Sequence, residues 1–413
     1  MKIAIAQLNY TIGDVEGNTF KIIDSINKAK AQRADLVIFA EQAVSGTPAF
    51  DLLRKTTFLE LCEDALVEIA SCCDGIAAIV GLPILTNDGT ISAAALIQDR
   101  KVLRYVGKKY ITARREMGFL SPSKGFEYAT IKGHKCAIIV GDDLSREHDF
   151  DQSVETIISI NARKYGKGTM TYRYEMMRNL AFVEGKNLVL VNQVGGSTDI
   201  VYDGTSGAMN GRGEVVLMMK NFEEDFRIFD TEAAAEPIVV PSTYNDRTRL
   251  VYEAARCGLR DFFRKNGYKK ASVGLSGGID SAVVACIAAD ALGAENVRAL
   301  LMPSPFSSFE SVEDAKELAC NLGIEYNVIP ISEIYTSVVN TLKPVIGGTE
   351  FDATEENIQT RIRTVLLMAL QNKTDYILLN SSNKSENALG LCTLYGDTAG
   401  AFSPTGDLYK SEM

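Results

Sequence analysis

Short apolar segments alternate with segments of helical periodicity along the first half of the chain. Phe20, Ile23, Ile26 and Ala29 recur at three-residue intervals, which predicts an amphipathic helix over residues 18–31. Apolar runs that predict buried strands lie at residues 2–6, 36–40, 76–81, 93–97, 137–140 and 188–192. This alternation predicts a layered α/β fold in which helices cover both faces of the sheets.

A polar, turn-rich segment from Thr231 to Arg247 interrupts the pattern, and we place a domain boundary there, between domains 1–240 and 241–413. Helical patterns then return and end at Gly293 and Gly323. In this second half we expect strands at residues 271–275, 297–302, 325–329 and 376–379, and helices at 281–292, 312–322 and 355–371. The order predicts a doubly wound parallel sheet.

Composition limits the class of protein. The 413 residues, 46% apolar and 23% charged, are typical of two or more globular domains. A net charge of -10 argues against nucleic acid as the main partner. The first apolar run is too short for a signal peptide, and no run reaches the roughly 18–20 residues of a membrane helix. Eight cysteines without a C-x-x-C pair, and only two histidines, argue against a zinc site and favour reduced thiols in a cytoplasmic protein.

The strongest local motif is the heptad LSGGIDS at residues 275–281, between a predicted strand and a predicted helix. Gly277 and Gly278 permit a tight turn and let phosphate oxygens approach backbone N–H groups. The helix that follows adds unpaired N–H donors, Ser276 and Ser281 add hydroxyls, and Asp280 suits a Mg²⁺ ion that bridges phosphates. The alternative is an ordinary strand–helix junction with a capping residue. The combination in this context favours a phosphate site.

This loop resembles the pyrophosphate loop of the N-type ATP pyrophosphatases, which include NAD⁺, GMP and asparagine synthetases. The loop alone does not choose among them. Four further segments together resemble the glutamine-dependent NAD⁺ synthetases: LMPS at 301–304, NIQTRIR at 357–363, LNSSNKSE at 379–386 and TLYGD at 393–397. The second domain is thereby expected to have an adenine nucleotide α-hydrolase-like fold.

The resemblance implies a ligase that activates the carboxylate of nicotinic acid adenine dinucleotide (deamido-NAD) with ATP and Mg²⁺, and then amidates it with ammonia. The ATP-binding residues that it implies are Ser276, Gly277, Gly278, Asp280, Ser281, Met302, Ser381 and Lys410. Deamido-NAD contacts are expected from Asn357, Arg361 and Glu386, and metal contacts from Asp280 and Glu386. The alternative for Arg361 and Arg363 is a solvated helix face. The sequence ends at residues 410–413 within a segment where family members continue, so we expect the synthetase domain to be truncated.

In the first domain, the segments FAE at 39–41, GTP at 46–48, DLL at 51–53, NQVGG at 192–196 and DGTS at 203–206 resemble the nitrilase-like (carbon-nitrogen hydrolase) glutaminase of the same family. The resemblance implies an α-β-β-α sandwich with a Glu–Lys–Cys triad. By this resemblance Glu41 is the general base, and Lys108, with Lys109 as a rival, stabilises the oxyanion. Glu116 is the candidate supporting carboxylate.

The nucleophile of this triad is missing. Where the family reads I-C-E-D-L-W, residues 140–145 read VGDDLS, so Gly141 stands in place of the cysteine. Cys136 lies five residues earlier, roughly 16 Å along a strand, and is expected to be a core residue. Neighbouring family segments also differ at residues 111–114 and 161–164. We therefore hypothesise that the glutaminase half-reaction is lost.

The leading interpretation is an NAD⁺-forming ligase, assembled as a homo-oligomer, that uses free ammonia or ammonia from another protein. Three alternatives remain open from the residues. The first is a glutamine-dependent enzyme with an unusual nucleophile. The second is a nitrilase-type amidohydrolase with a regulatory second domain, and the third is a non-catalytic nucleotide-binding assembly subunit.

Overall fold

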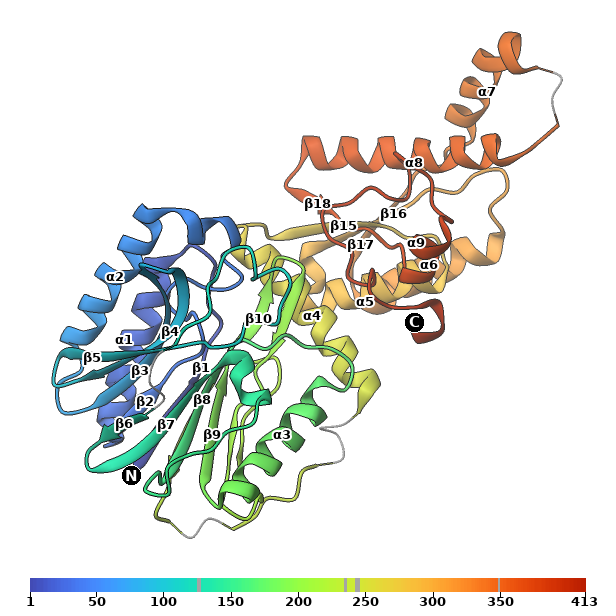
Figure 1. The fold of residues 1–413 in the computed structure, drawn as a ribbon. Coiled ribbons are helices and arrows are strands. Elements are labelled where there is room, and N and C mark those ends of the chain that lie inside the picture. Colours follow the sequence, from blue (N-terminus) through green and yellow to red (C-terminus); the bar gives the residue numbers. More distant parts are fainter. Residues whose placement is uncertain (125–127, 234–235, 242–245, 348–349) are drawn as a thin grey trace. The chain divides into compact units, whose positions relative to one another are not determined.

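The protein forms two compact units, Met1–Leu250 and Val251–Met413 (Figure 1). The coordinates, a computed structural model, describe residues 1–413 except 125–127, 234–235, 242–245 and 348–349. Part of the turn-rich boundary segment therefore lies outside the described residues. Helix α4 (Arg247–Lys265) begins directly after this segment.

Two six-stranded sheets form the framework of the first unit. In spatial order the first sheet contains β14 (Asp225–Asp230), β1 (Lys2–Gln7), β2 (Leu36–Ile38), β3 (Ala77–Thr86), β4 (Gly89–Gln98) and β5 (Lys101–Gly107). The second contains β13 (Val215–Met218), β12 (Gly207–Met209), β9 (Asn187–Asn192), β8 (Thr156–Asn161), β7 (His134–Val140) and β6 (Tyr128–Ile131). A short antiparallel ribbon pairs β10 (Val194–Ser197) with β11 (Ile200–Asp203).

Alternation of apolar side chains along these strands explains the layers. Ile3 and Ile5 of β1 share one buried cluster with Ile138 and Val140 of β7, so the two sheets pack face to face. On the outer face of the first sheet pack α1 (Val15–Ala31) and α2 (Thr56–Ser71), and α3 (Thr169–Glu184) packs on the outer face of the second (Figure 1). The predicted α-β-β-α sandwich is confirmed.

The first predicted helix exists, but its buried face matches the predicted one only in part. Helix α1 is capped by the Asp14 side chain, which accepts a hydrogen bond from the Gly17 N–H at 3.0 Å. Ile22 and Ile26 are fully buried, whereas Phe20 is 73% exposed. The predicted stripe was therefore right at Ile26 and Ala29 and wrong at Phe20, because the buried face also includes small polar residues that periodicity of apolar residues does not detect.

A four-stranded parallel sheet forms the centre of the second unit, in the order β17 (Glu325–Val328), β16 (Val297–Leu301), β15 (Lys270–Gly274) and β18 (Tyr376–Leu378). The remaining helices are α5 (Ile279–Leu292), α6 (Phe309–Leu322), α7 (Ser332–Ile346), α8 (Ala353–Lys373) and α9 (Lys384–Leu389). The chain leaves β15 toward β16 and later returns to pair β18 on its other side. This reversal creates a switch point at the carboxyl end of β15, where open α/β sheets bind ligands.

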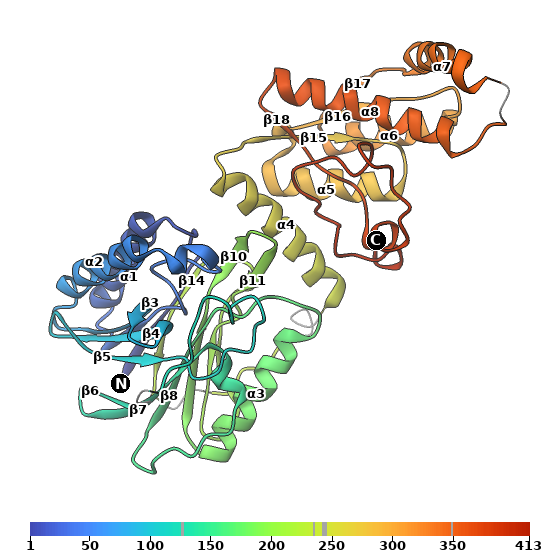
Figure 2. The ribbon, with the colours of Figure 1, turned by 45° about the horizontal axis from the view of Figure 1, so that its top comes forward.

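Helices cover both faces of this sheet, as the sequence predicts. Ala299 and Leu301 of β16 pack with α4, α5 and α6, while the intervening Leu300 packs with α8. Figure 2 shows α5 and α8 on opposite sides of the strands. The helical assignments begin slightly earlier than predicted, since α5 starts at Ile279 and places Asp280 in its first turn.

The cysteines are all free, but fewer are buried than the apolar runs around them suggest. Cys62, Cys73, Cys136 and Cys257 are buried, whereas Cys320 and Cys392 are exposed. No helix among the described residues is both long and apolar enough to cross a membrane.

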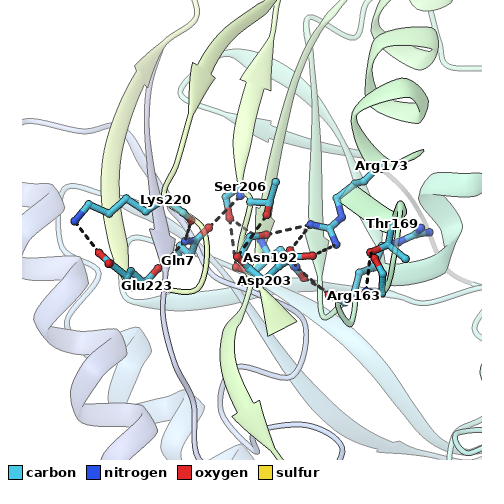
Figure 3. Close-up of polar contacts among 12 residues, drawn as sticks. Gln7, Arg163, Thr169, Arg173, Asn192, Asp203, Ser206, Lys220 and Glu223 are labelled. Atoms are coloured by element: carbon cyan, nitrogen blue, oxygen red, sulfur yellow. Dashed lines mark hydrogen bonds and ion pairs between the residues drawn. The ribbon is translucent and has the colours of Figure 1, made fainter. Parts of the chain in front are cut away.

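A buried ion pair in the first unit joins α3 to the last residue of β11 (Figure 3). The Arg173 guanidinium donates to both carboxylate oxygens of Asp203, at 2.7 and 3.2 Å, and both side chains are almost fully inaccessible to solvent. The Asn192 side-chain amide donates to the same carboxylate at 3.4 Å and to the Arg163 carbonyl at 3.1 Å. The Arg163 backbone N–H in turn donates to Asn192 Oδ1 at 2.8 Å. The pair thus fixes the backbone that carries Arg163.

We expect Arg173→Met to lower the free energy of unfolding by about 3–5 kcal/mol, because Asp203 would keep a buried, uncompensated charge. Urea unfolding curves followed by circular dichroism would measure the loss.

Arg115→Met is the matched control, since Arg115 and Asp199 form an ion pair whose side chains are 61% and 58% exposed. An exposed pair contributes about 0–1 kcal/mol. Equal losses in the two variants would contradict the role assigned to the buried pair.

Candidate functional site

The phosphate loop lies between β15 and α5, at the switch point of the second sheet. Gly277 has φ +85°, and a Cβ at this position would lie 2.2 Å from the Ser311 carbonyl oxygen. The turn therefore requires glycine for its conformation and for its close packing. Ser276 and Ser281 close the loop, because the Ser281 hydroxyl accepts from the Ser276 N–H at 3.2 Å and donates to the Gly278 carbonyl at 3.0 Å.

Asp280 is held from two sides. Its Oδ1 accepts a hydrogen bond from the Asn383 side-chain amide at 3.0 Å, and its Oδ2 is paired with the Lys410 ammonium group. Burial favours the neutral acid, but the bonds from Lys410 and Asn383 outweigh this effect and hold the pKa of Asp280 below its usual value. Asp280 is therefore a stable carboxylate at neutral pH.

Asn383 links Asp280 to Glu386. It is fully buried and caps α9, with its Oδ1 accepting from the Glu386 N–H at 3.0 Å. Its own N–H donates to Glu386 Oε2 at 3.0 Å, which completes a reciprocal capping box. One buried residue thus holds both carboxylates that the resemblance assigns to a metal, Asp280 through its side-chain amide and Glu386 through its backbone N–H.

The donor set fits Mg²⁺, which commonly takes one or two carboxylates together with substrate phosphates. The ammonium group of Lys410 already forms an ion pair with the Asp280 carboxylate. Among the described residues, no group of three or more His, Cys, Asp or Glu side chains could hold a metal. The remaining ligands would therefore have to come from phosphate oxygens and water.

A cavity of about 350 Å³ opens beside the phosphate loop. Its wall includes Ser276, Met302 and Ser381, three of the residues assigned to ATP. Much of the remaining wall is apolar and comes from the carboxyl ends of the strands and from α8, including Leu275, Leu300, Leu367, Leu378 and Leu379. An apolar pocket beside a phosphate loop suits a nucleotide base.

Asn357 and Arg361 lie on α8 but are not among the residues that line this cavity. The Thr393 hydroxyl donates to Asn357 Oδ1 at 2.7 Å, and Arg361 Nε donates to the Leu394 carbonyl at 3.2 Å. Both contacts involve the TLYGD segment. The structure therefore brings together two of the segments that resemble the family, NIQTRIR and TLYGD.

In the first unit, Lys108 lies among three carboxylates. Its ammonium nitrogen is 3.2 Å from Glu41, 2.9 Å from Glu116 and 3.5 Å from Asp142. Burial alone would lower the pKa of Lys108, but these carboxylates raise it above its usual value. Of the two lysine candidates, Lys108 is the one whose side chain pairs with Glu41. Burial and the charge of Glu41 raise the pKa of Glu116.

Gly141 begins the 3₁₀ turn Gly141–Ser145 directly after β7, with φ +58°. A Cβ added here would lie 2.5 Å from Glu41 Oε2. Ser92 holds the other Glu41 oxygen through its hydroxyl at 2.9 Å. The position thus carries no thiol, and the Glu41 carboxylate fills the space that a side chain would need.

Comparison with known proteins gives a consistent result for both units. Residues 251–413 match the NAD synthase family, and residues 2–235 match the carbon-nitrogen hydrolase family. Glutamine-dependent NAD(+) synthetases of Acinetobacter baylyi and Aquifex aeolicus are each 36% identical, over 99% and 100% of this chain and 77% and 80% of theirs. This chain belongs to the glutamine-dependent NAD⁺ synthetase family.

Solved structures agree with this membership. The synthetase of Acinetobacter baumannii in complex with ADP is 35% identical and superposes with a TM-score of 0.93, over 100% of this chain and 80% of that one. The synthetase of Cytophaga hutchinsonii, 21% identical with a TM-score of 0.89, has the same fold.

Two residues of the NAD⁺ synthetase unit were missing from the predicted site. Asn383 could have been found, since Asn383-x-x-Glu386 is a capping-box pattern. Arg363 could not, because charges two positions apart on a helix suggest a solvated face. In the structure Arg363 lines the cavity, and its Nε donates to the Met302 carbonyl at 3.0 Å.

Arg363 is suited to an anionic ligand. Burial lowers the pKa of Arg363, and no carboxylate among the described residues pairs with it. We expect Arg363→Met to weaken ADP binding about tenfold, the effect of losing one charge-assisted hydrogen bond. Isothermal titration calorimetry would measure this loss.

Arg361→Met is the control, because it removes the same charge from the same helix at a position outside the cavity wall. Its ADP affinity should stay that of the unmodified chain. An equal loss in both variants would indicate a general electrostatic effect and not a contact from Arg363.

Proposed function

We propose that this protein adenylates deamido-NAD with ATP and amidates the product with ammonia, which yields NAD⁺, AMP and pyrophosphate. The observation that carries the proposal is the cavity at the switch point, whose apolar wall meets the phosphate loop at Ser276, with Asp280 in the first turn of the helix that follows the loop. The activity named for its relatives agrees with this geometry. A pure assembly subunit would have no use for such a site.

The proposed reaction needs alignment and charge neutralisation. A carboxylate oxygen of deamido-NAD attacks the α-phosphorus of ATP, and the bond to pyrophosphate breaks. The ammonia nitrogen then attacks the acyl carbon, AMP leaves with the bridging oxygen, and the nitrogen loses a proton to solvent. The N–H groups of Gly277 and Gly278, with the first turn of α5, would bind the departing pyrophosphate.

The other assigned residues orient the substrates. Ser276, Ser281, Met302, Ser381 and Lys410 would contact ATP, and Asn357, Arg361 and Glu386 would contact deamido-NAD. Asp280 and Glu386 would hold Mg²⁺, which would supply positive charge to the phosphates.

We propose further that the nitrilase-like unit does not hydrolyse glutamine. Amide hydrolysis by this family requires a thiolate, and Glu41 Oε2 occupies the space beside Gly141 where the thiol would stand. Cys136 does not replace it, because burial raises the pKa of its thiol to about 12. The same geometry disfavours both a glutamine-dependent enzyme with an unusual nucleophile and a nitrilase-type amidohydrolase.

The setting of the proposed reaction is the cytoplasm, where free thiols stay reduced. By resemblance to the family, the chain would assemble as a homo-oligomer through its nitrilase-like units, which would then serve assembly in place of ammonia production.

The decisive assay supplies ATP, Mg²⁺ and deamido-NAD with either ammonium or glutamine, and measures NAD⁺, AMP and glutamate. We expect NAD⁺ and AMP with ammonium, and neither NAD⁺ nor glutamate with glutamine. Equal rates with both nitrogen sources would reject the loss of the glutaminase. No product from either source would reject the synthetase.

Gly141→Cys tests whether the missing thiol is the sole defect. We expect no glutamate release, because the new side chain would meet Glu41 at a position with φ +58°. The ammonium-dependent rate of the same variant serves as the control for folding. Glutamine hydrolysis by this variant would show that the rest of the pocket remains functional.

A further inference from the structure

The ion pair between Asp280 and Lys410 places a positive charge beside the phosphate loop. Asp280 stands in the first turn of α5, and Lys410 lies 130 residues later, in the short 3₁₀ segment Lys410–Glu412. The N-terminus of a helix attracts anions, and at this helix start the Lys410 ammonium group is paired with Asp280 Oδ2. Lys410 thus sits where phosphate and metal would both arrive.

The two oxygens of the Asp280 carboxylate are held with different strength. Asn383 on Oδ1 is fully buried, and its remaining side-chain oxygen and backbone N–H are engaged in the cap of α9. Lys410 on Oδ2 is 52% exposed at its side chain, and its backbone N–H is anchored to the Ser385 hydroxyl at 3.0 Å. An ion pair with one exposed, flexible partner is weak and can exchange. The carboxylate therefore has one fixed oxygen and one exchangeable oxygen.

We propose that Lys410 is an exchangeable cation that couples metal binding at Asp280 to nucleotide binding. Without nucleotide, the Lys410 ammonium neutralises Asp280 and competes with a divalent cation for Oδ2. When phosphate oxygens enter the loop, they provide a second anionic partner for Lys410, and Oδ2 becomes available to the metal. The inference rests on the proposed function, since it takes Asp280 to be a metal-binding carboxylate.

This arrangement makes the two ligands cooperative. A group that must be displaced lowers the apparent affinity of the metal, and a ligand that removes the group restores that affinity. By linkage, the metal strengthens nucleotide binding by the same factor. Asn383 keeps the carboxylate in one orientation during the exchange, because its three hydrogen bonds do not involve Lys410.

The test uses Mn²⁺ as the metal probe and ADP as the phosphate probe, each alone, on the full chain. We expect Lys410→Met to bind Mn²⁺ about three- to fivefold more tightly in the absence of nucleotide, because the competing ion pair is gone. Electron paramagnetic resonance of free Mn²⁺ would measure this change. The same variant should bind ADP more weakly in the presence of EDTA, measured by calorimetry. A merely structural role for Lys410 would weaken both ligands.

Three further variants complete the test. Lys316→Met changes the net charge equally but removes an exposed pair with Glu313 on α6, so both affinities should stay unchanged. Lys410→Arg keeps a cation and should restore the behaviour of the unmodified chain. Asp280→Asn should abolish Mn²⁺ binding.

The outcomes separate the inference from the proposed function. If Asp280→Asn leaves Mn²⁺ binding intact, the metal site of the proposed function fails and the inference fails with it. If Asp280→Asn abolishes Mn²⁺ binding but Lys410→Met leaves the Mn²⁺ affinity equal or weaker, the inference alone is overturned.

Discussion

The close approach of the Gly277 backbone to the Ser311 carbonyl shapes the site of the second unit. A side chain at residue 277 would overlap that carbonyl, so the loop can turn into α5 only through glycine. The turn leaves the first N–H groups of α5 without helical partners, and these donors provide the positive end of the site. The cavity wall, the Asp280 carboxylate and the Asn383 link all lie around that helix start.

The two units differ in how their charged side chains are paired. In the nitrilase-like unit, Lys108 is buried among carboxylates that neutralise it, and Arg173 and Asp203 neutralise each other. Such groups are costly to bury unless they are paired, so the charged cluster persists as a structural feature although Gly141 provides no nucleophile. In the synthetase unit, Arg363 lacks a carboxylate partner among the described residues, and Lys410 has one that is easily exchanged. Only the second arrangement leaves charge available to a ligand.

Local patterns predicted much of this architecture. The predicted strands and the predicted helices occur, because runs of apolar residues and capping residues act over a few positions. The placement of Phe20 on the buried face was wrong, since that face contains small polar residues that an apolar pattern misses. A local sequence pattern also could not predict where the Arg363 guanidinium lies. An arginine two positions after Arg361 on α8 gives the same sequence pattern whether its side chain faces solvent or a cavity.

The sequence by itself determined that the chain has a glycine phosphate loop, synthetase motifs around it, and no cysteine at residue 141. These are properties of residue identity and short spacing. Only the tertiary structure decided that Glu41 occupies the space beside Gly141, that Asn383 joins Asp280 to Glu386, and that Lys410 pairs with Asp280. Such contacts join segments far apart in the chain, and their distances follow from how sheets and helices pack, which no local pattern encodes.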